Sequence, residues 1–78
     1  MTLEDLNHRI DEALKEGAPR PGALPQTNIL NAEFSLGKYF ALLFLIKDVH
    51  GIPAMIETKE RTQAAVDDLT NRAQAIYK

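Results

Sequence analysis

The two histidines are the first side chains in this sequence that could do chemistry. His8 follows Glu4 by four residues and Asp5 by three, so in a helix the imidazole would share a face with a carboxylate, as metal sites in helical bundles require. That face lies away from the apolar stripe of the same segment, so we interpret His8 as a solvated surface residue. His50 lies at the predicted end of a helix, where an imidazole suits the negative end of the dipole. We therefore expect no metal and no other cofactor.

The sequence also offers no convincing carboxylate pair or nucleophile for catalysis. The close carboxylate pairs on the last predicted helix are Glu57 with Glu60 and Asp67 with Asp68, and both lie among basic and polar residues. General acid–base catalysis instead needs one carboxyl group buried beside a cleft. Ser35 is the only serine, the chain has no cysteine, and no glycine-rich phosphate loop is present. We expect no catalytic residues and a protein that is not an enzyme.

The composition is typical of one folded domain over residues 1–78, with 45% hydrophobic and 26% charged residues. A formal net charge of -2 with scattered basic residues makes nucleic acid an unfavourable partner. The N-terminal segment is acidic and lacks the basic start and apolar stretch of a signal peptide, so we expect a cytoplasmic protein. Without disulfides, a chain of 78 residues has a marginal core, and oligomerisation is the remaining route to stability.

Two segments precede the apolar centre of the chain. Residues 1–16 are predicted to form an amphipathic helix, with Thr2 as its N-cap and Gly17 ending it in a left-handed conformation. Residues 17–27 contain three of the four prolines, which do not suit a helix interior. This second segment is therefore predicted to be an extended linker.

Two longer helices follow and complete an all-α fold. The first covers residues 28–50, with Thr27 or Asn28 as its cap, and the second covers residues 53–77. The short connection between them favours an antiparallel helical hairpin. The last helix has one stripe at steps of three and four: Ile52, Met55, Lys59, Thr62, Val66, Leu69, Ala73 and Ile76.

The helix over residues 28–50 is apolar on two faces. Eight apolar residues from Tyr39 to Ile46 follow one another without a polar residue, and such a helix must be covered on more than one side. The run is shorter than the roughly 20 apolar residues that span a bilayer, so we interpret it as a buried helix and expect no membrane partner. Its first face packs against the last helix. These hairpin contacts are predicted to involve Leu36, Tyr39, Leu43, Ile46, Val66, Leu69 and Ile76.

The second face of this helix has no equivalent cover. It carries Leu30, Phe34, Ala41, Phe44 and Leu45, and exposing each large side chain forfeits roughly 1.5–3 kcal/mol. Two arrangements compete: a monomeric three-helix bundle in which the N-terminal helix closes this face, and a symmetric homodimer that buries two such faces together. We favour the homodimer, with these five residues as its interface, because the added buried area matters most in a small chain. A different protein in place of the second copy is the third possibility.

The predicted function is a non-enzymatic module for protein–protein interaction, scaffolding or regulation, of the kind found among small bacterial or phage accessory proteins. The alternative is a DNA-binding regulator with a helix-turn-helix around Gly51, in which Thr58, Lys59, Arg61 and Gln63 would face the major groove. Against this alternative, charged residues occupy the positions about six after and about four before the glycine, where the motif usually keeps an apolar and a small residue.

Overall fold

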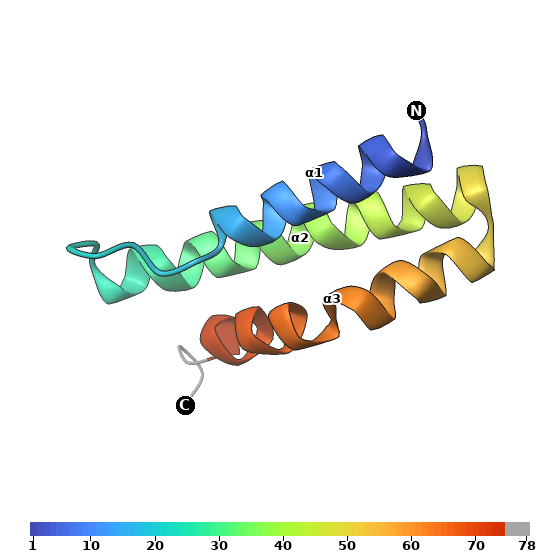
Figure 1. Cartoon of the computed structure of the whole chain (residues 1–78). Helices are drawn as coiled ribbons and strands as arrows, with labels where there is room; N and C mark the ends of the chain where they lie inside the picture. Colours follow the sequence, from blue (N-terminus) through green and yellow to red (C-terminus); the bar gives the residue numbers. More distant parts are fainter. Residues whose placement is uncertain (75–78) are drawn as a thin grey trace.

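Residues 1–74 are described by a computed structural model and form three helices without a strand (Figure 1). Helix α1 covers Leu3–Glu16, α2 covers Pro25–His50 and α3 covers Ile52–Ala73. Neighbouring helices run antiparallel along a molecule that measures 38 × 21 × 16 Å. The all-α fold and the hairpin of α2 and α3 are as predicted.

The start of α1 is fixed by its cap, and its end by close packing. Thr2 accepts a hydrogen bond of 3.1 Å from the backbone N–H of Asp5. At the other end Gly17 has a φ of -81°, so the predicted left-handed conformation is wrong. The glycine is needed for space instead, because a Cβ there would lie 2.5 Å from Leu69 and 2.7 Å from Ser35. The Arg72 guanidinium also donates to the Gly17 carbonyl, which ties the end of α1 to α3.

Helix α2 begins three residues earlier than predicted, so the linker is shorter. Pro25 occupies the first turn, where its missing N–H would have no partner in the helix. Asn28, expected as a cap, lies inside the helix, and its side-chain oxygen accepts from the backbone N–H of Arg20 in the linker at 3.1 Å. The composition of residues 17–27 led to this error, because a proline that ends one helix can equally begin the next.

Helix α3 follows α2 after a single residue. Gly51 has a φ of +93°, which favours glycine, and its N–H closes the last turn of α2 on the Lys47 carbonyl at 3.0 Å. The predicted stripe of α3 was wrong at two positions: Ile52 is exposed, and Lys59 is exposed while Thr58 is buried in its place. The buried Thr58 hydroxyl keeps a partner because it donates to the side-chain oxygen of Asn7 at 2.9 Å, whereas a buried lysine needs a charged partner. The predicted end of the helix, residues 75–77, lies outside the described residues.

The core forms where α1 and α3 pack side by side against one face of α2. Six buried residues make its main cluster: Leu6, Ile10, Tyr39, Leu43, Ile46 and Val66. Ala32, Leu69 and Ala73 make a second cluster, and Leu36 is half-buried against both. Every predicted hairpin residue is therefore at least half-buried except Ile76, which lies outside the described residues. Since α1 packs on the same face as α3, it leaves the second face of α2 open.

Replacing Gly17 with alanine should destabilise the fold, because the added methyl group would force α1 away from α2 and α3. We expect the free energy of unfolding, measured by urea denaturation and circular dichroism, to fall by roughly 1–3 kcal/mol. Ala18→Ser changes the exposed neighbouring position and should alter it by less than about 0.5 kcal/mol. Equal stability of the two variants would contradict the close approach at Gly17.

Candidate interaction surface

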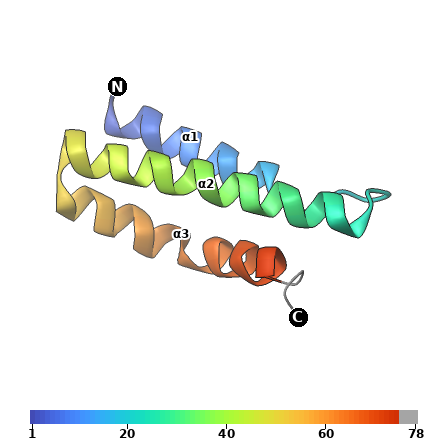
Figure 2. The same ribbon diagram turned by 180° about the vertical axis from the view of Figure 1, so that it is seen from behind.

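The side of α2 that faces away from α1 and α3 is apolar and exposed. Seen from behind, α2 lies in front of α1 and no helix covers its near side (Figure 2). Phe34 is 70% exposed and Phe44 58%. We call this surface the outer face of α2 and define it by seven exposed residues: Leu30, Phe34, Gly37, Phe40, Ala41, Phe44 and Leu45. It contains all five residues that the sequence predicted for a dimer interface.

Phe40 belongs to the outer face but was not predicted. It is 44% exposed, and its ring meets that of Tyr39 edge-on, with centroids 5.3 Å apart. At 100° per residue Phe40 lies about 40° from Phe44 round the helix. From the sequence alone, this position could belong either to the outer face or to the edge of the contact with the last helix. Whether a residue at this boundary is covered depends on the position of α3. The helical period does not predict the position of a neighbouring helix.

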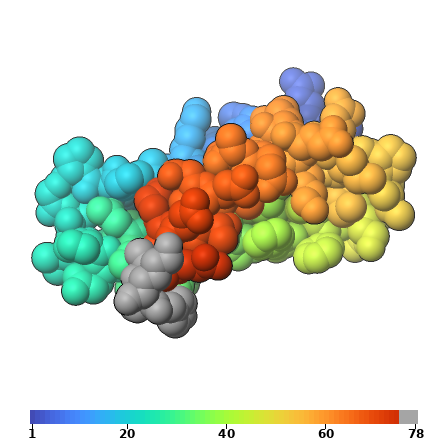
Figure 3. Space-filling model, turned by 90° about the horizontal axis from the view of Figure 1, so that it is seen from below, coloured from blue at the N-terminus to red at the C-terminus, as the bar shows by residue number. Residues whose placement is uncertain are grey.

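The size of the outer face is close to that of a functional patch. A whole phenylalanine side chain has roughly 150–250 Å² of surface, so the three phenylalanines expose roughly 350 Å² per chain. With Leu30 and Leu45, two such faces together would bury about 1,000 Å², the lower limit for a specific interface. Side chains of α2 reach the surface along one long edge of the molecule, beside α3 (Figure 3).

Helix α2 also has the length and composition of a membrane-spanning helix, and within residues 1–74 it alone does. An 18-residue window of α2 reaches a mean hydropathy of 1.5. The uninterrupted run of eight apolar residues considered in the sequence is by itself too short to span a bilayer. The core helix of a soluble protein passes the same test, but only 28% of this window is buried inside the chain. The fold therefore leaves most of the window exposed.

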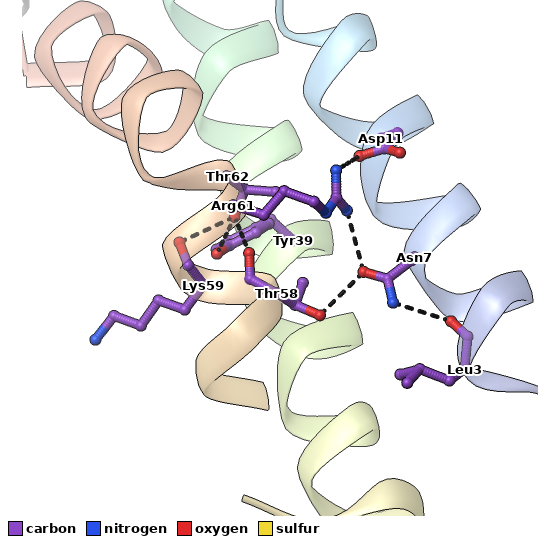
Figure 4. Close-up of polar contacts among 8 residues, drawn as sticks. All are labelled: Leu3, Asn7, Asp11, Tyr39, Thr58, Lys59, Arg61 and Thr62. Atoms are coloured by element: carbon purple, nitrogen blue, oxygen red, sulfur yellow. Dashed lines mark hydrogen bonds and ion pairs between the residues drawn. The ribbon is translucent and has the colours of Figure 1, made fainter. Parts of the chain in front are cut away.

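The opposite side of the molecule is held by polar contacts between α1 and α3 (Figure 4). The side-chain oxygen of Asn7 accepts from the Thr58 hydroxyl at 2.9 Å and from Arg61 at 3.0 Å. Arg61 also donates to Asp11 at 2.8 Å, in an ion pair whose two side chains are each 45% exposed. An ion pair so exposed contributes about 0–1 kcal/mol, so its role is chiefly to fix the position of α1.

A second polar contact lies inside the core (Figure 4). The Tyr39 and Thr62 hydroxyls are 2.8 Å apart, and Thr62 donates its proton to the Thr58 carbonyl at 2.8 Å. Tyr39 is therefore the donor in the contact with Thr62. Both residues are buried, so the Tyr39 hydroxyl cannot hydrogen bond to water. Its bond to Thr62 replaces that hydrogen bond and avoids the cost of a buried, unpaired hydroxyl.

The residues considered for catalysis are dispersed. His8 pairs with Glu12 at 3.0 Å on the exposed side of α1, not with Glu4 or Asp5. The ring Nε2 atom of His50 lies 3.1 Å from the carbonyl oxygen of Met1. The carboxylates of α3 (Glu57, Glu60, Asp67 and Asp68) are exposed, whereas Ser35 is buried against Gly17. Residues 1–74 contain no group of three potential metal ligands close enough to hold an ion.

The helix-turn-helix alternative gains no support from the arrangement of α2 and α3. Thr58 is buried beneath α1, and Arg61 is engaged with Asn7 and Asp11, so neither is presented to a groove. Lys59 and Gln63 are exposed, but Gln63 donates to Asp67 at 2.8 Å. The two helices also run side by side as a hairpin, whereas the motif requires them to cross at a wide angle.

Substitution of Thr62 by valine should cost more stability than substitution of Tyr39 by phenylalanine. The first leaves the buried Tyr39 hydroxyl without an acceptor, which costs about 1–3 kcal/mol, whereas the second removes one hydrogen bond worth about 0.5–1.5 kcal/mol. Urea denaturation of both variants at one protein concentration compares the two. A smaller loss for Thr62→Val than for Tyr39→Phe would contradict the donor assignment.

Comparison with known proteins assigns this chain to no family. No family model, curated protein or solved structure matches it. In the described part of the chain, the outer face of α2 holds five of the exposed large apolar side chains: Leu30, Phe34, Phe40, Phe44 and Leu45.

Proposed function

We propose that this protein is a non-enzymatic interaction module that acts as a homodimer, in which two copies bury the outer faces of α2 against each other. The observation that carries the proposal is the exposure of three phenylalanines on one side of a helix whose other side is already occupied by α1 and α3. The dimer would serve a scaffolding or regulatory role in the cytoplasm, with α1 and α3 of each copy facing outward.

The energetics of covering the outer face favour association. Phe34, Phe40 and Phe44 are each 44–70% exposed, so covering them contributes roughly 1–2 kcal/mol apiece in each copy. Across two copies this sum is of the same order as the cost of association, about 4–15 kcal/mol. Leu30 and Leu45 add to the gain. We therefore expect a reversible dimer whose population depends on protein concentration.

A second copy fits the outer face better than the interior of a membrane does. The inner face of α2 is bonded to α3 through Tyr39 and packed against α1, and both helices would have to separate from α2 before it could span a bilayer. Glu33, Lys47 and Asp48 are exposed on α2 close to the outer face, and ionised side chains are costly in hydrocarbon. In a dimer Glu33 and Lys47 can remain in water at the rim, and Asp48 can remain in water at the end of the interface.

Phe44→Asp should weaken the dimer without unfolding the chain, because Phe44 makes no part of the buried core. We expect the dissociation constant, measured by light scattering after size-exclusion chromatography at several concentrations, to rise at least about tenfold. Leu24→Asp is the matched control, since Leu24 is equally apolar, is 68% exposed and lies before α2, outside its outer face. It should leave the dissociation constant unchanged.

Two results would overturn the proposal. One is a wild-type chain that stays a single copy at every concentration, and the other is a dimer that Phe44→Asp does not weaken. If the chain stays a single copy, flotation with phosphatidylcholine vesicles shows whether a membrane or a different protein covers the outer face. A single chain that floats would assign the outer face to a membrane, and one that does not float would assign it to a different protein.

A further inference from the structure

The residues along the outer face of α2 have the same spacing when read in either direction. Its midline runs through Leu30, Phe34, Gly37, Ala41 and Phe44 and continues to Asp48 beyond the face, at steps of four, three, four, three and four, and all six residues are exposed. The spacing is symmetric about position 39, although the outermost pair is unlike, with Leu30 at one end and Asp48 at the other. A phenylalanine lies at equal distance on each side of this centre, and a small residue lies on each side between them.

We infer that the second copy lies antiparallel on α2, with the two-fold axis beside position 39; this rests on the homodimer proposed above. Residues whose numbers are equally far from 39 on opposite sides then meet across the interface. Phe34 packs against Phe44 of the second copy, and Gly37 against Ala41 of the second copy. Both contacts occur twice, as a two-fold interface requires.

Within residues 1–74, no contact explains the glycine at position 37. A Cβ added there would meet nothing within 4 Å, so the fold of one copy does not require glycine at this position. A glycine inside a helix is less favourable than alanine because it loses more conformational freedom on folding. Opposite Ala41 of the second copy, it lets two backbones approach at the centre while the phenylalanines fill the space on either side.

Charges beside the midline favour the antiparallel arrangement. Glu33 and Lys47 lie on the same edge of the outer face, six residues before and eight residues after its centre. Across this axis they are offset by about 3 Å along the helix, which is within the reach of the two side chains. Neither has an ion-pair partner within residues 1–74. The antiparallel arrangement brings each Glu33 close to Lys47 of the second copy, and the two Phe40 side chains lie close to the axis. It also keeps the two Asp48 side chains at opposite ends of the interface.

A parallel arrangement would be less favourable at the same positions. It would place the two Asp48 carboxylates side by side and Gly37 opposite Gly37. Its one charge contact would join Glu33 to Lys38 of the second copy, but Lys38 already binds Glu16 of its own chain at 2.6 Å. In the antiparallel dimer the two Lys38 side chains lie near the axis, where Glu16 of each chain offsets their charge.

Cysteine cross-linking tests the direction of the two helices, because the chain has no cysteine of its own. Leu30→Cys and Asp48→Cys are made in separate chains, treated with a short bismaleimide alone and as a mixture, and analysed by mass spectrometry. We expect the mixture to give a product that joins position 30 of one chain to position 48 of the other, at least about fivefold more abundant than either self-linked product. Sedimentation of each variant establishes that the dimer is present.

The outcomes separate this inference from the proposed function. Self-linked products from each variant alone would show a parallel dimer and overturn the inference while leaving the homodimer standing. A dimer that gives no cross-link at either position would place the interface elsewhere and overturn both. Single chains in sedimentation would overturn the homodimer itself, and the inference with it.

A charge exchange gives an independent readout. Glu33→Lys and Lys47→Glu should each weaken the dimer, by roughly tenfold at low salt, because each turns two attractive contacts into repulsive ones. The double variant, Glu33→Lys with Lys47→Glu, should restore the wild-type dissociation constant. Single variants that bind as well as the wild type would contradict the antiparallel arrangement.

Discussion

The structure of this protein depends on one imbalance: its central helix is apolar on more sides than the other helices of residues 1–74 cover. Helix α2 has 26 residues, and both neighbouring helices pack on the same face of it. The covered face holds the core, from Ala32 to Ile46, while the phenylalanines of the other face remain exposed. Exposed apolar surface of this kind marks an interaction site, whichever molecule covers it.

Polar contacts explain why α1 does not rotate round α2 to close the outer face. Asn7 and Asp11 bind Thr58 and Arg61 of α3, and Arg72 binds the carbonyl of Gly17 at the far end of α1. These contacts and the packing of Leu6 and Ile10 hold α1 beside α3. The fold thus uses its N-terminal helix to complete the inner core, and the outer face is left for association.

Much of this arrangement could be predicted from the sequence, because helical period and apolar spacing are local properties. The three helices, the buried Tyr39 and Leu43 and the presence of a second apolar face on α2 all followed from them. The predictions that failed depended on contacts between distant segments. The close fit of Gly17 against Leu69 and the choice of Thr58 over Lys59 on the inner side of α3 are set by how the helices lie together, and no spacing within one helix encodes that.

Sedimentation equilibrium of the unmodified chain, over a range of concentrations in buffer without lipid or detergent, tests the central claim most directly. If a second copy covers the outer face of α2, the measured mass will rise with concentration to twice the 8.7 kDa of one chain. A mass that remains at one chain over the whole range would contradict self-association and leave the outer face to a different partner.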